Sequence, residues 1–453
     1  MMYTIDENNE LSVALLAKLI KRHMVDIDRF EKLRDYYEGR HTILGRTMSN
    51  PDLPNNRLVC NYAKYIVDMS TGYLLGVPVE YESKPDIQAV LDAYYKQTIS
   101  NVDSELAKQV GIYGVAYELL YADEKADPKS AKLSPQTAFL VCNDTVEEKK
   151  LFAVHYYPQF DIDGNLTGHI VNVYTPAEAI HYKVKSGAFD AMEETGRESH
   201  YFGGVPLIEY ENNDERQGDF EQVISLMDAY NVLMSDRVND KEQLVDAILV
   251  IINAQLGKEG YNLLKEQRGI ELPEGSDAKF LTKQLTESDV EVLKKAITDD
   301  IHKFSLVPNL TDELFAGNLS GVAIRYKLFG FNQLIKTKER YFESGLMERF
   351  ELYNNYLNVK SNMPIIPTTE VSAVFSRNLP VNEMELAQMA ATLKDTLSDE
   401  SIITLLTPLL SSLDPAEELK KLNAQRKEKV ANAQSAFGYT TNTPASEMNE
   451  DEE

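Results

Sequence analysis

The sequence of 453 residues contains no tryptophan, only two cysteines and no apolar run of 18 residues. Cys60 and Cys142 stand far apart with no CxxC spacing, which favours buried thiols over a disulfide or a metal site. Such cysteine use is typical of a reducing compartment. Because the apolar runs are short and residues 1–7 are acidic, we expect neither a membrane span nor a signal peptide.

Positive charge is scarce: 46 lysines and arginines stand against 72 aspartates and glutamates, a formal net charge of −26. A basic groove for DNA needs clustered Lys and Arg to neutralise phosphates, so this composition excludes a DNA-binding protein of that kind. An acidic balance also serves solubility alone. The charge therefore excludes one class without choosing among the others.

Catalytic signatures are missing as well. The sequence has no GxGxxG or GxxxxGK[ST] phosphate loop, no GxSxG, no HExxH and no CxxC pair. The run 322–327 faintly resembles the lysine strand of kinases, but no HRD or DFG follows it. Residues 161–165 are similar to the start of a calcium loop that lacks its twelfth-place Glu, so a turn is the favoured interpretation. We predict no enzymatic activity, no cofactor and no metal. The histidines that lack metal-ligand spacing are His155, His169, His181 and His200.

What is present is a mixture of helical and strand patterns, and the length predicts two to four structural units. Residues 137–184 are rich in β-branched and aromatic residues and carry a hairpin signal at Asp163-Gly164. Gly111 and Gly114 would let another backbone approach closely. Apolar residues at helical spacing occupy four earlier stretches: 11–40, 56–76, 87–95, and 104–121, the last turning into a strand.

A second long helix starts at Asp219, where apolar residues advance by three and four as in a coiled coil. The β-branched run 247–252 predicts a strand after it, then a small insert and a returning helix over 288–306. We therefore predict a helical hairpin with an α/β insert at its tip. The residues expected to pack in this hairpin are Phe220, Val223, Met227, Tyr230 and Met234, with Val290, Leu293, Ile297, Ile301 and Phe304 on the returning helix.

The stretch from Val307 to Asn355 organises the second half of the chain. A polar segment punctuated by glycines leads into a long helical pattern from Val322 to Tyr353. We expect Asn318 or Ser320 to cap this helix. Gly330 and Gly345 are expected bends. After it come a strand from Val371, helices over 383–397 and 399–410, a last helix from Asp414, and a polar end whose final residues are acidic and predict disorder.

Seven short runs, in order along the chain, resemble the portal proteins of tailed bacteriophages, in the long-tailed siphophage subgroup. Together they lie between about residues 30 and 400, so the combination is specific although no single run is. The runs are 56–68, 72–78, 113–121, 206–213, 219–230, 320–328 and 375–380.

The resemblance implies an α+β, mainly α, portal fold and a ring, usually a dodecamer, at one vertex of the capsid. DNA would enter and leave through its centre, driven by a separate terminase, and the ring itself would have no enzymatic activity. A closed ring suits helices with exposed apolar stripes. An acidic wall suits passing DNA. The implied parts are a wing over 1–218, stem helices over 219–246 and 287–307, a clip over 247–286, a tunnel loop over 308–321, a long wing helix and strand over 322–382, a helical crown over 383–425 and a disordered tail over 426–453.

The implied partners are other copies of the chain, the terminase large subunit, head-completion or neck proteins, scaffolding and major capsid proteins, and double-stranded DNA, with no membrane. The location would be the virion, and the host cytoplasm during assembly. The DNA-facing tunnel-loop residues would be Asn309, Thr311, Asp312, Glu313, Gly317, Asn318, Ser320 and Gly321; the clip docking surface would be Lys258, Glu259, Lys265, Glu266 and Gln267. Arg325, Lys327, Lys336, Lys338 and Arg340 are favoured as partners in salt bridges between subunits over DNA clamps.

Two other classes stay open. One is an oligomeric scaffolding or adaptor protein of non-viral origin, without enzymatic activity. The other is a nuclease or protease fused to a helical domain. The absence of a metal or nucleophile constellation argues against the second class.

Overall fold

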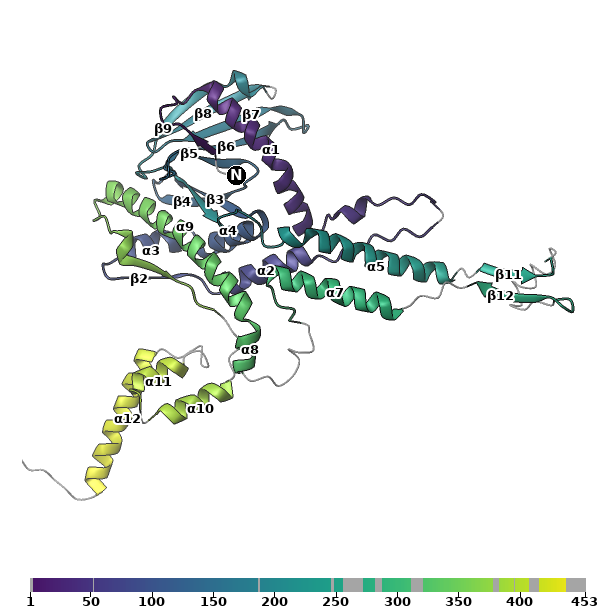
Figure 1. Ribbon diagram of the computed structural model, residues 1–453. Coiled ribbons are helices and arrows are strands. Elements are labelled where there is room, and N and C mark those ends of the chain that lie inside the picture. The colour runs from purple at the N-terminus through teal and green to yellow at the C-terminus, as the bar shows by residue number, and fades with distance from the viewer. Residues whose placement is uncertain are drawn as a thin grey trace, which may run out of the picture. The chain divides into compact units, whose positions relative to one another are not determined.

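The computed structural model divides into two compact units, which are described separately. The larger unit comprises Met1–Asp312 and Leu328–Asn378, and the smaller comprises Glu313–Lys327 and Leu379–Glu453. Figure 1 colours the chain from its N-terminus to its C-terminus. The structure describes residues 3–51, 53–185, 188–245, 248–255, 272–281, 287–310, 321–377, 383–394, 396–406 and 415–436.

The first layer of the larger unit is a six-stranded sheet covered by α1 (Val13–Tyr37). Leu16 and Ile20 of α1 are fully buried against Phe139 and Val154 of the sheet. The first strand pairs parallel to its neighbour and all other pairs are antiparallel. In spatial order the strands are β1 (Tyr3–Ile5), β5 (Ala138–Asn143), β6 (Lys150–Phe160), β7 (Leu166–Tyr174), β8 (Glu178–Lys185) and β9 (Glu193–Ser199).

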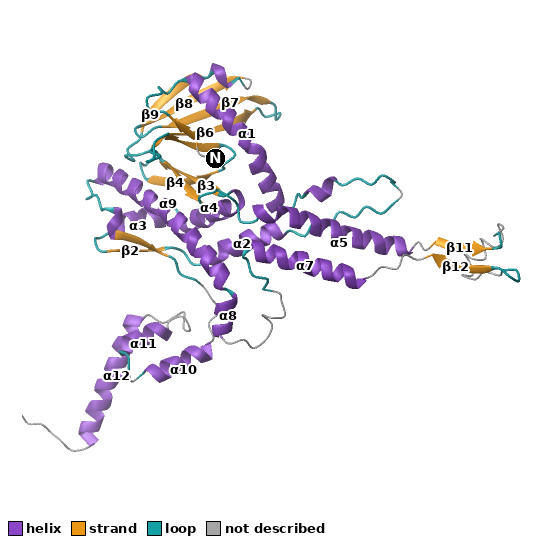
Figure 2. Ribbon diagram, in the orientation of Figure 1, coloured by secondary structure: helices purple, strands orange, loops and turns teal. Residues whose placement is uncertain are grey.

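A second core joins helices to two smaller sheets (Figure 2). Strands β10 (Leu207–Glu211), β3 (Val115–Ala122) and β4 (Pro128–Leu133) form one sheet, and β2 (Glu80–Ser83) pairs with β13 (Val371–Val374) in the other. The helices around them are α2 (Tyr62–Leu75), α3 (Gln88–Tyr95), α4 (Ile99–Tyr113) and α9 (Phe329–Ser361).

Two further helices of the larger unit, α5 (Ile224–Val245) and α7 (Glu287–Ser305), pack against each other. Between them in sequence, β11 (Ile248–Ile252) and β12 (Asp277–Leu281) form an antiparallel pair. The predicted long helix, the strand after it and the returning helix are therefore confirmed, while residues 256–271 of the predicted insert lie outside the described residues. The described residues of this unit also include the short 3-10 turns η1 (Thr42–Gly45), η2 (Phe189–Ala191), η3 (Glu221–Val223) and η5 (Thr368–Glu370).

The smaller unit is helical in its described residues. It contains α8 (Gly321–Lys327), α10 (Glu383–Leu393), α11 (Asp399–Leu406) and α12 (Pro415–Ala436). α11 contacts both α10 and α12, and an ion pair joins Arg426 to Asp399. The expected tail from residue 426 is wrong at its start, because α12 continues to Ala436.

The prediction of a mixed fold of helices and strands is confirmed, and the hairpin at Asp163-Gly164 joins β6 to β7. The long helical pattern was expected to bend at two glycines, and neither glycine divides it. α9 runs without interruption through Gly330 and Gly345, and the separation from α8 falls at Leu328. Gly345 serves packing, since a Cβ there would lie 2.5 Å from the ring of Tyr210.

Candidate functional site: the helix pair and its attachment to the body

The apolar stripe of α5 lies against the body of its own chain. Phe220, Val223 and Met227 are at most 1% exposed and Tyr230 is buried, while Met234 is half-buried against the same core. Each was predicted to pack, and all five do. The stripe is consequently part of the core of its own chain.

Neighbouring elements cover only part of the apolar face of α7. Ile301 is fully buried and Ile297 packs against the core, as predicted. Leu293 and Phe304 were also predicted to pack, but they are 50% and 55% exposed, and the adjacent Val292 is 70% exposed. Within a single chain, the prediction for Leu293 and Phe304 is therefore wrong. Helical spacing shows which residues share a face, but it does not show how much of that face a neighbouring element covers.

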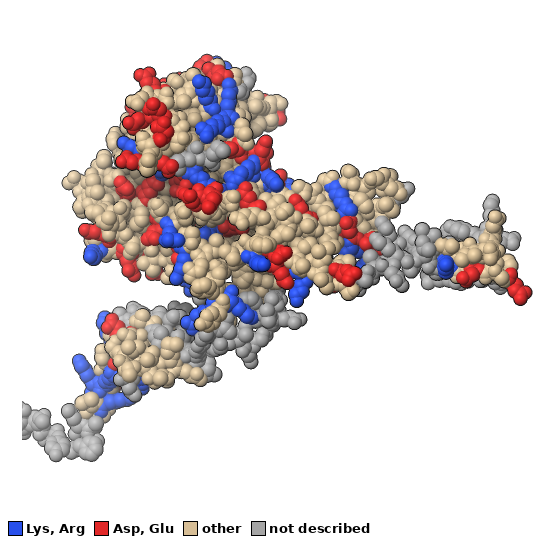
Figure 3. Space-filling model, in the orientation of Figure 1, with Lys and Arg blue, Asp and Glu red and all other residues tan. Residues whose placement is uncertain are grey.

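Charged residues of both signs accompany the helix pair on the face shown in Figure 3. An ion pair of 2.5 Å joins Arg237 of α5 to Glu291 of α7, and Lys294 lies 3.6 Å from the same carboxylate. Glu291 is half exposed, so these pairs contribute little to stability. Burial would raise the pKa of Glu291, but the hydrogen bond from Arg237 outweighs it and the pKa is lowered.

Three polar side chains of α5 are buried beside its apolar stripe. Asn231 and Ser235 are fully buried and Asn239 is 3% exposed. They are spaced by four residues, so they lie along one line of the helix surface. Buried polar groups need hydrogen-bond partners, and the partners here are backbone groups of residues 56–60.

Residues 56–60 bind this line of side chains through alternate N–H groups. The N–H of Asn56 donates to Oδ1 of Asn239 (2.7 Å), that of Leu58 to Oγ of Ser235 (3.0 Å), and that of Cys60 to Oδ1 of Asn231 (2.8 Å). Four helical residues rise about 6 Å and two extended residues about 6.6 Å, so the two spacings match. We call residues 42–60 the arm.

The arm has further bonds to α5. Asp228 accepts from the hydroxyl group of Thr42, and Arg46 pairs with Asp236 at 2.6 Å. Asp228 also accepts from the hydroxyl of Tyr36, which belongs to α1. The sequence pattern placed residues 56–60 at the start of a helical stretch over 56–76, which is wrong because α2 begins at Tyr62, and the arm was missed. The signal for the arm was the set of small polar residues at four-residue spacing beside the apolar stripe of α5.

The start of α5 is bound to α9 by a buried ion pair. Nζ of Lys338 lies 2.6 Å from Oδ2 and 2.8 Å from Oδ1 of Asp219, and both side chains are less than 5% exposed. Nδ2 of Asn212 donates to the same carboxylate at 2.9 Å. Lys338 was expected to pair with another subunit. This is corrected here, because its ammonium is buried and has its partner in its own chain.

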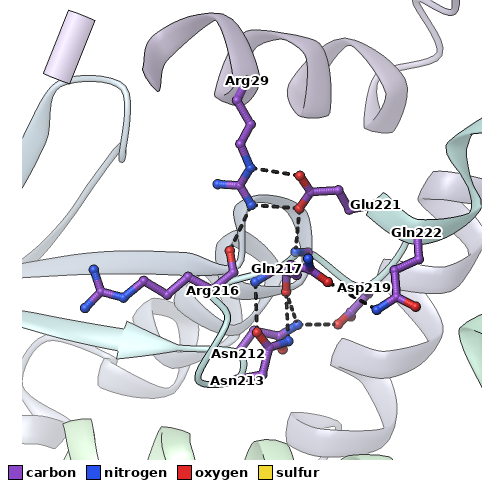
Figure 4. A network of polar contacts seen from close by, with 9 residues as sticks. Arg29, Asn212, Asn213, Arg216, Gln217, Asp219, Glu221 and Gln222 are labelled. Carbon is purple, nitrogen blue, oxygen red and sulfur yellow. Dashed lines mark hydrogen bonds and ion pairs between the residues drawn. The ribbon is translucent and has the colours of Figure 1, made fainter. Parts of the chain in front are cut away.

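A second group of contacts holds the turn before α5 against α1 (Figure 4). Arg29 makes a bidentate pair with Glu221 at 2.7 and 2.8 Å, and donates to the carbonyl oxygen of Arg216 at 2.8 Å. The amide of Asn212 donates to the carbonyl of Gln217 at 2.7 Å. Bidentate arginine pairs fix orientation as well as distance. The direction in which α5 leaves the body is thus set by charged and amide groups.

Two glycines of α4 make room for the same turn. A Cβ at Gly111 would lie 2.9 Å from Oδ2 of Asp219, and one at Gly114 would collide with the carbonyl oxygen of Arg216. Gly114 also has φ of +83°, which glycine adopts without strain. The prediction that another backbone approaches is therefore confirmed at Gly114, whereas at Gly111 a Cβ would meet side-chain atoms of Asp219 and Val67.

The far end of α9 is fixed by a charged cluster without solvent access. NH1 of Arg349 donates to Asp103 at 2.5 Å and lies 3.3 Å from Glu118, whose other oxygen accepts from Tyr210 at 2.6 Å. Burial raises the pKa of Asp103, against the opposing effect of Arg349. Burial would lower the pKa of Arg349, but the two carboxylates hold it well above its usual value. Breaking one partner of such a cluster is costly.

Most of the other predicted site residues lie outside the residues that the structure describes. In the tunnel loop, Asn309 is half-buried and Gly321 is the first residue of α8; Thr311, Asp312, Glu313, Gly317, Asn318 and Ser320 are outside the described residues. Lys258, Glu259, Lys265, Glu266 and Gln267 of the clip are also outside them. Arg325 and Lys327 are exposed on α8, and Lys336 and Arg340 are exposed on α9.

Neither cysteine forms a disulfide, and Cys142 is buried as expected of a core thiol. Over the part of the chain that the structure describes, no group of three or more His, Cys, Asp and Glu is placed to hold a metal ion. No helix among the same residues is both long and apolar enough to cross a membrane.

The sequence matches the family model of SPP1 Gp6-like phage portal proteins over residues 16–431. The chain therefore belongs to this family of phage portal proteins, as the seven motifs indicated. It is 23% identical over 440 residues to the portal protein of Bacillus phage SPP1, covering 93% of this chain and 85% of that one. It is 23% identical over 436 residues to the portal protein of Clostridium phage phiCD119, covering 87% and 93%.

Two solved structures were also matched. One is the neck of an empty gene transfer agent (GTA) particle, with 13% identity and a TM-score of 0.44 over 76% of this chain and 89% of the other. The second is the virion of a native GTA particle, with 13% identity and a TM-score of 0.45 over 84% and 93%.

Proposed function

We propose that this chain assembles into a closed homododecameric ring at the unique vertex of a phage capsid, forming the channel for DNA packaging and ejection. The observation that carries the proposal is the family match over residues 16–431. In this assignment α5 and α7 are the stem helices, residues 247–286 the clip, residues 308–321 the tunnel loop, and α10 to α12 the crown.

The exposed part of α7 supplies a surface that such a ring needs. Val292, Leu293 and Phe304 are each at least half exposed on a helix in which Ile301 is fully buried. A closed ring is built from one heterologous contact, in which a surface of each copy meets a different surface of the next. Burying these side chains against the adjacent copy would offset the unfavourable hydration that they have in a single chain.

The partners follow from the same assignment. The clip, including Lys258, Glu259, Lys265, Glu266 and Gln267, docks the terminase large subunit and later the head-completion or neck proteins. The rest of the body meets scaffolding and major capsid proteins. The ring performs no chemistry of its own, because the motor is the terminase, and it assembles in the host cytoplasm before it becomes part of the virion.

Mass measurement and electron microscopy of the purified protein test the ring. We expect a discrete assembly of about twelve chains with an open channel, while a stable monomer at micromolar concentration under several salt conditions would overturn the proposal. Val292→Asp should shift the population towards monomers, because it places a charge in the contact. Val25→Asp is the matched control, since Val25 is an equally exposed helical valine, 74% against 70%.

A further inference from the structure

The chain crosses between the larger and the smaller unit three times, after Asp312, before Leu328 and after Asn378. In the larger unit, the residues next to all three crossings are held by one short helix, α2. Its contacts come from residues that share one face at spacings of three, four and four. We call this the tyrosine face of α2: Tyr62, Tyr65, Met69 and Tyr73.

Tyr65 holds the chain before the first crossing. Its hydroxyl donates to the carbonyl oxygen of Pro308 at 2.8 Å and accepts from the N–H of Leu310 at 3.4 Å. The turn before it is held too. The ring of His302 meets Tyr62 and Tyr65 edge to face at 5.8 and 5.7 Å, and its Nδ1 bonds the carbonyl oxygen of Val307 at 2.9 Å.

Tyr73 holds the chain at the other two crossings. Its hydroxyl donates to Oδ1 of Asn332 at 2.5 Å, and its ring lies 4.8 Å from that of Phe331 in the first turn of α9. The guanidinium of Arg377 lies 5.5 Å from the centroid of the same ring. Arg377 stands just before the third crossing in the sequence. Arg377 also pairs with Glu339 of α9 at 2.5 Å. In Figure 2, α2 lies between α7 and α9.

We infer that the tyrosine face of α2 is the platform that fixes the two ends of the segment 311–330, which contains most of the channel-lining residues of the proposed ring. Tyr65 and Tyr73 are eight residues apart on one rigid helix, so the two ends of the segment between them are held at a fixed separation of about 12 Å along the helix axis. This rests on the proposed function, in which residues 308–321 line the channel. Tyr65 and Tyr73 are then positioning residues, which do not touch DNA themselves.

The hydroxyl groups can be removed while the rings stay in place. Tyr65→Phe, Tyr73→Phe and the double variant lose the bonds to Pro308, Leu310 and Asn332 but keep the aromatic contacts. Tyr95→Phe is the control, because Tyr95 is 71% exposed on α3. Hydrogen exchange on the purified full-length protein should be roughly two- to tenfold faster at residues 307–310 in Tyr65→Phe and at 328–335 in Tyr73→Phe. The control should match the original protein.

DNA packaging by the assembled rings is the second measurement. Rings of unchanged mass and melting temperature that package several-fold more slowly support the inference, since a purely structural role would lower the melting temperature as well. Unchanged exchange, or faster exchange with packaging at the original rate, overturns it. If Tyr73→Phe fails to fold, Asn332→Ala removes the same bond from the other side. If the unmodified protein forms no ring, the proposed function fails, whereas the exchange measurement still decides the role of α2.

Discussion

Nζ of Lys338 lies 2.6 Å from Oδ2 of Asp219, although the two residues are 119 positions apart and both side chains are almost inaccessible to water. The pair joins α9 to the turn from which α5 starts. Any change in the position of one helix therefore acts on the other through two opposite charges in a medium of low dielectric constant. In the proposed ring, this is the direct link between the long wing helix and the stem.

We predict that Asp219→Asn destabilises the protein by about 3–5 kcal/mol, because it leaves the ammonium of Lys338 buried without a counter-charge. The double variant Asp219→Asn with Lys338→Met should be markedly more stable than Asp219→Asn alone. Thermal or urea unfolding of the purified protein measures both. Glu291→Gln is the control, since its pair with Arg237 is half exposed and should be worth at most about 1 kcal/mol. Equal losses in the single and double variants would contradict the buried-charge explanation.

The arm gives a local prediction. Ser235→Ala removes the acceptor of the Leu58 N–H, and the arm should open more often because it loses one of its hydrogen bonds to α5. Hydrogen exchange at Leu58 should rise by roughly tenfold or more, with smaller increases at Asn56 and Cys60. Ser225→Ala, at an exposed position of the same helix, is the matched control. Exchange that rises equally in both variants would mean that the whole of α5 has loosened.

Histidine burial predicts a loss of stability in acid. Burial lowers the pKa of His23 from 6.5 to about 4, and the neutral ring fits its partners: Nε2 donates to the carbonyl of Pro135 and Nδ1 accepts from Tyr156. Between these two pKa values only the unfolded chain is protonated, so stability is fully present above pH 6.5 and falls towards pH 4. The loss from this residue is about 3 kcal/mol.

Melting temperatures of the original protein and of His23→Gln, measured from pH 8 to pH 4, test this prediction. The variant should begin less stable and then lose less between pH 6.5 and pH 4. His181→Gln serves as the control, because His181 is only half-buried and bonds the side chain of Asn172. Parallel curves for His23→Gln and the original protein would show that carboxylates alone cause the acid loss.

Sequence patterns correctly predicted the features that depend on residues close together in the chain. The three-four spacing from Phe220 to Met234 gave a helix and its buried stripe, and Asp163-Gly164 gave a turn, because both depend on local geometry. The prediction that another backbone segment approaches Gly114 was also correct, because such an approach requires a residue without a Cβ.

Contacts between distant residues were not predictable in this way. From the sequence alone, Lys338 is one of several basic residues expected on the surface of a helix. Only the fold places Asp219 beside it. The contact of the arm with Ser235 could not be predicted either, because its donor is a backbone N–H group, which nearly every residue has. Leu293 shows the reverse case, an apolar residue on the correct helical face that the described residues of its own chain leave half exposed.

The tunnel segment gives the last prediction. Asp312 and Glu313 are the only charged residues of 308–321, so in the proposed ring each copy would contribute two negative charges to this part of the channel. These charges repel the phosphates of passing DNA, and no bond has to be broken as the DNA moves. Asp312→Lys with Glu313→Lys changes the segment from two negative to two positive charges. DNA should then be retained in the channel in a salt-dependent way, and packaging should stall at low ionic strength and recover partly as salt is added.

The matched control reverses two adjacent acids elsewhere, Glu147→Lys with Glu148→Lys, in an exposed loop after β5. It makes the same change in total charge, so a stall caused by net charge alone would occur in both variants. Native mass measurement should give the same ring for both, because neither pair adds or removes apolar burial. A packaging assay at several salt concentrations decides the matter. Full-length packaging at the normal rate in low salt by the Asp312→Lys, Glu313→Lys ring would show that these side chains do not face DNA.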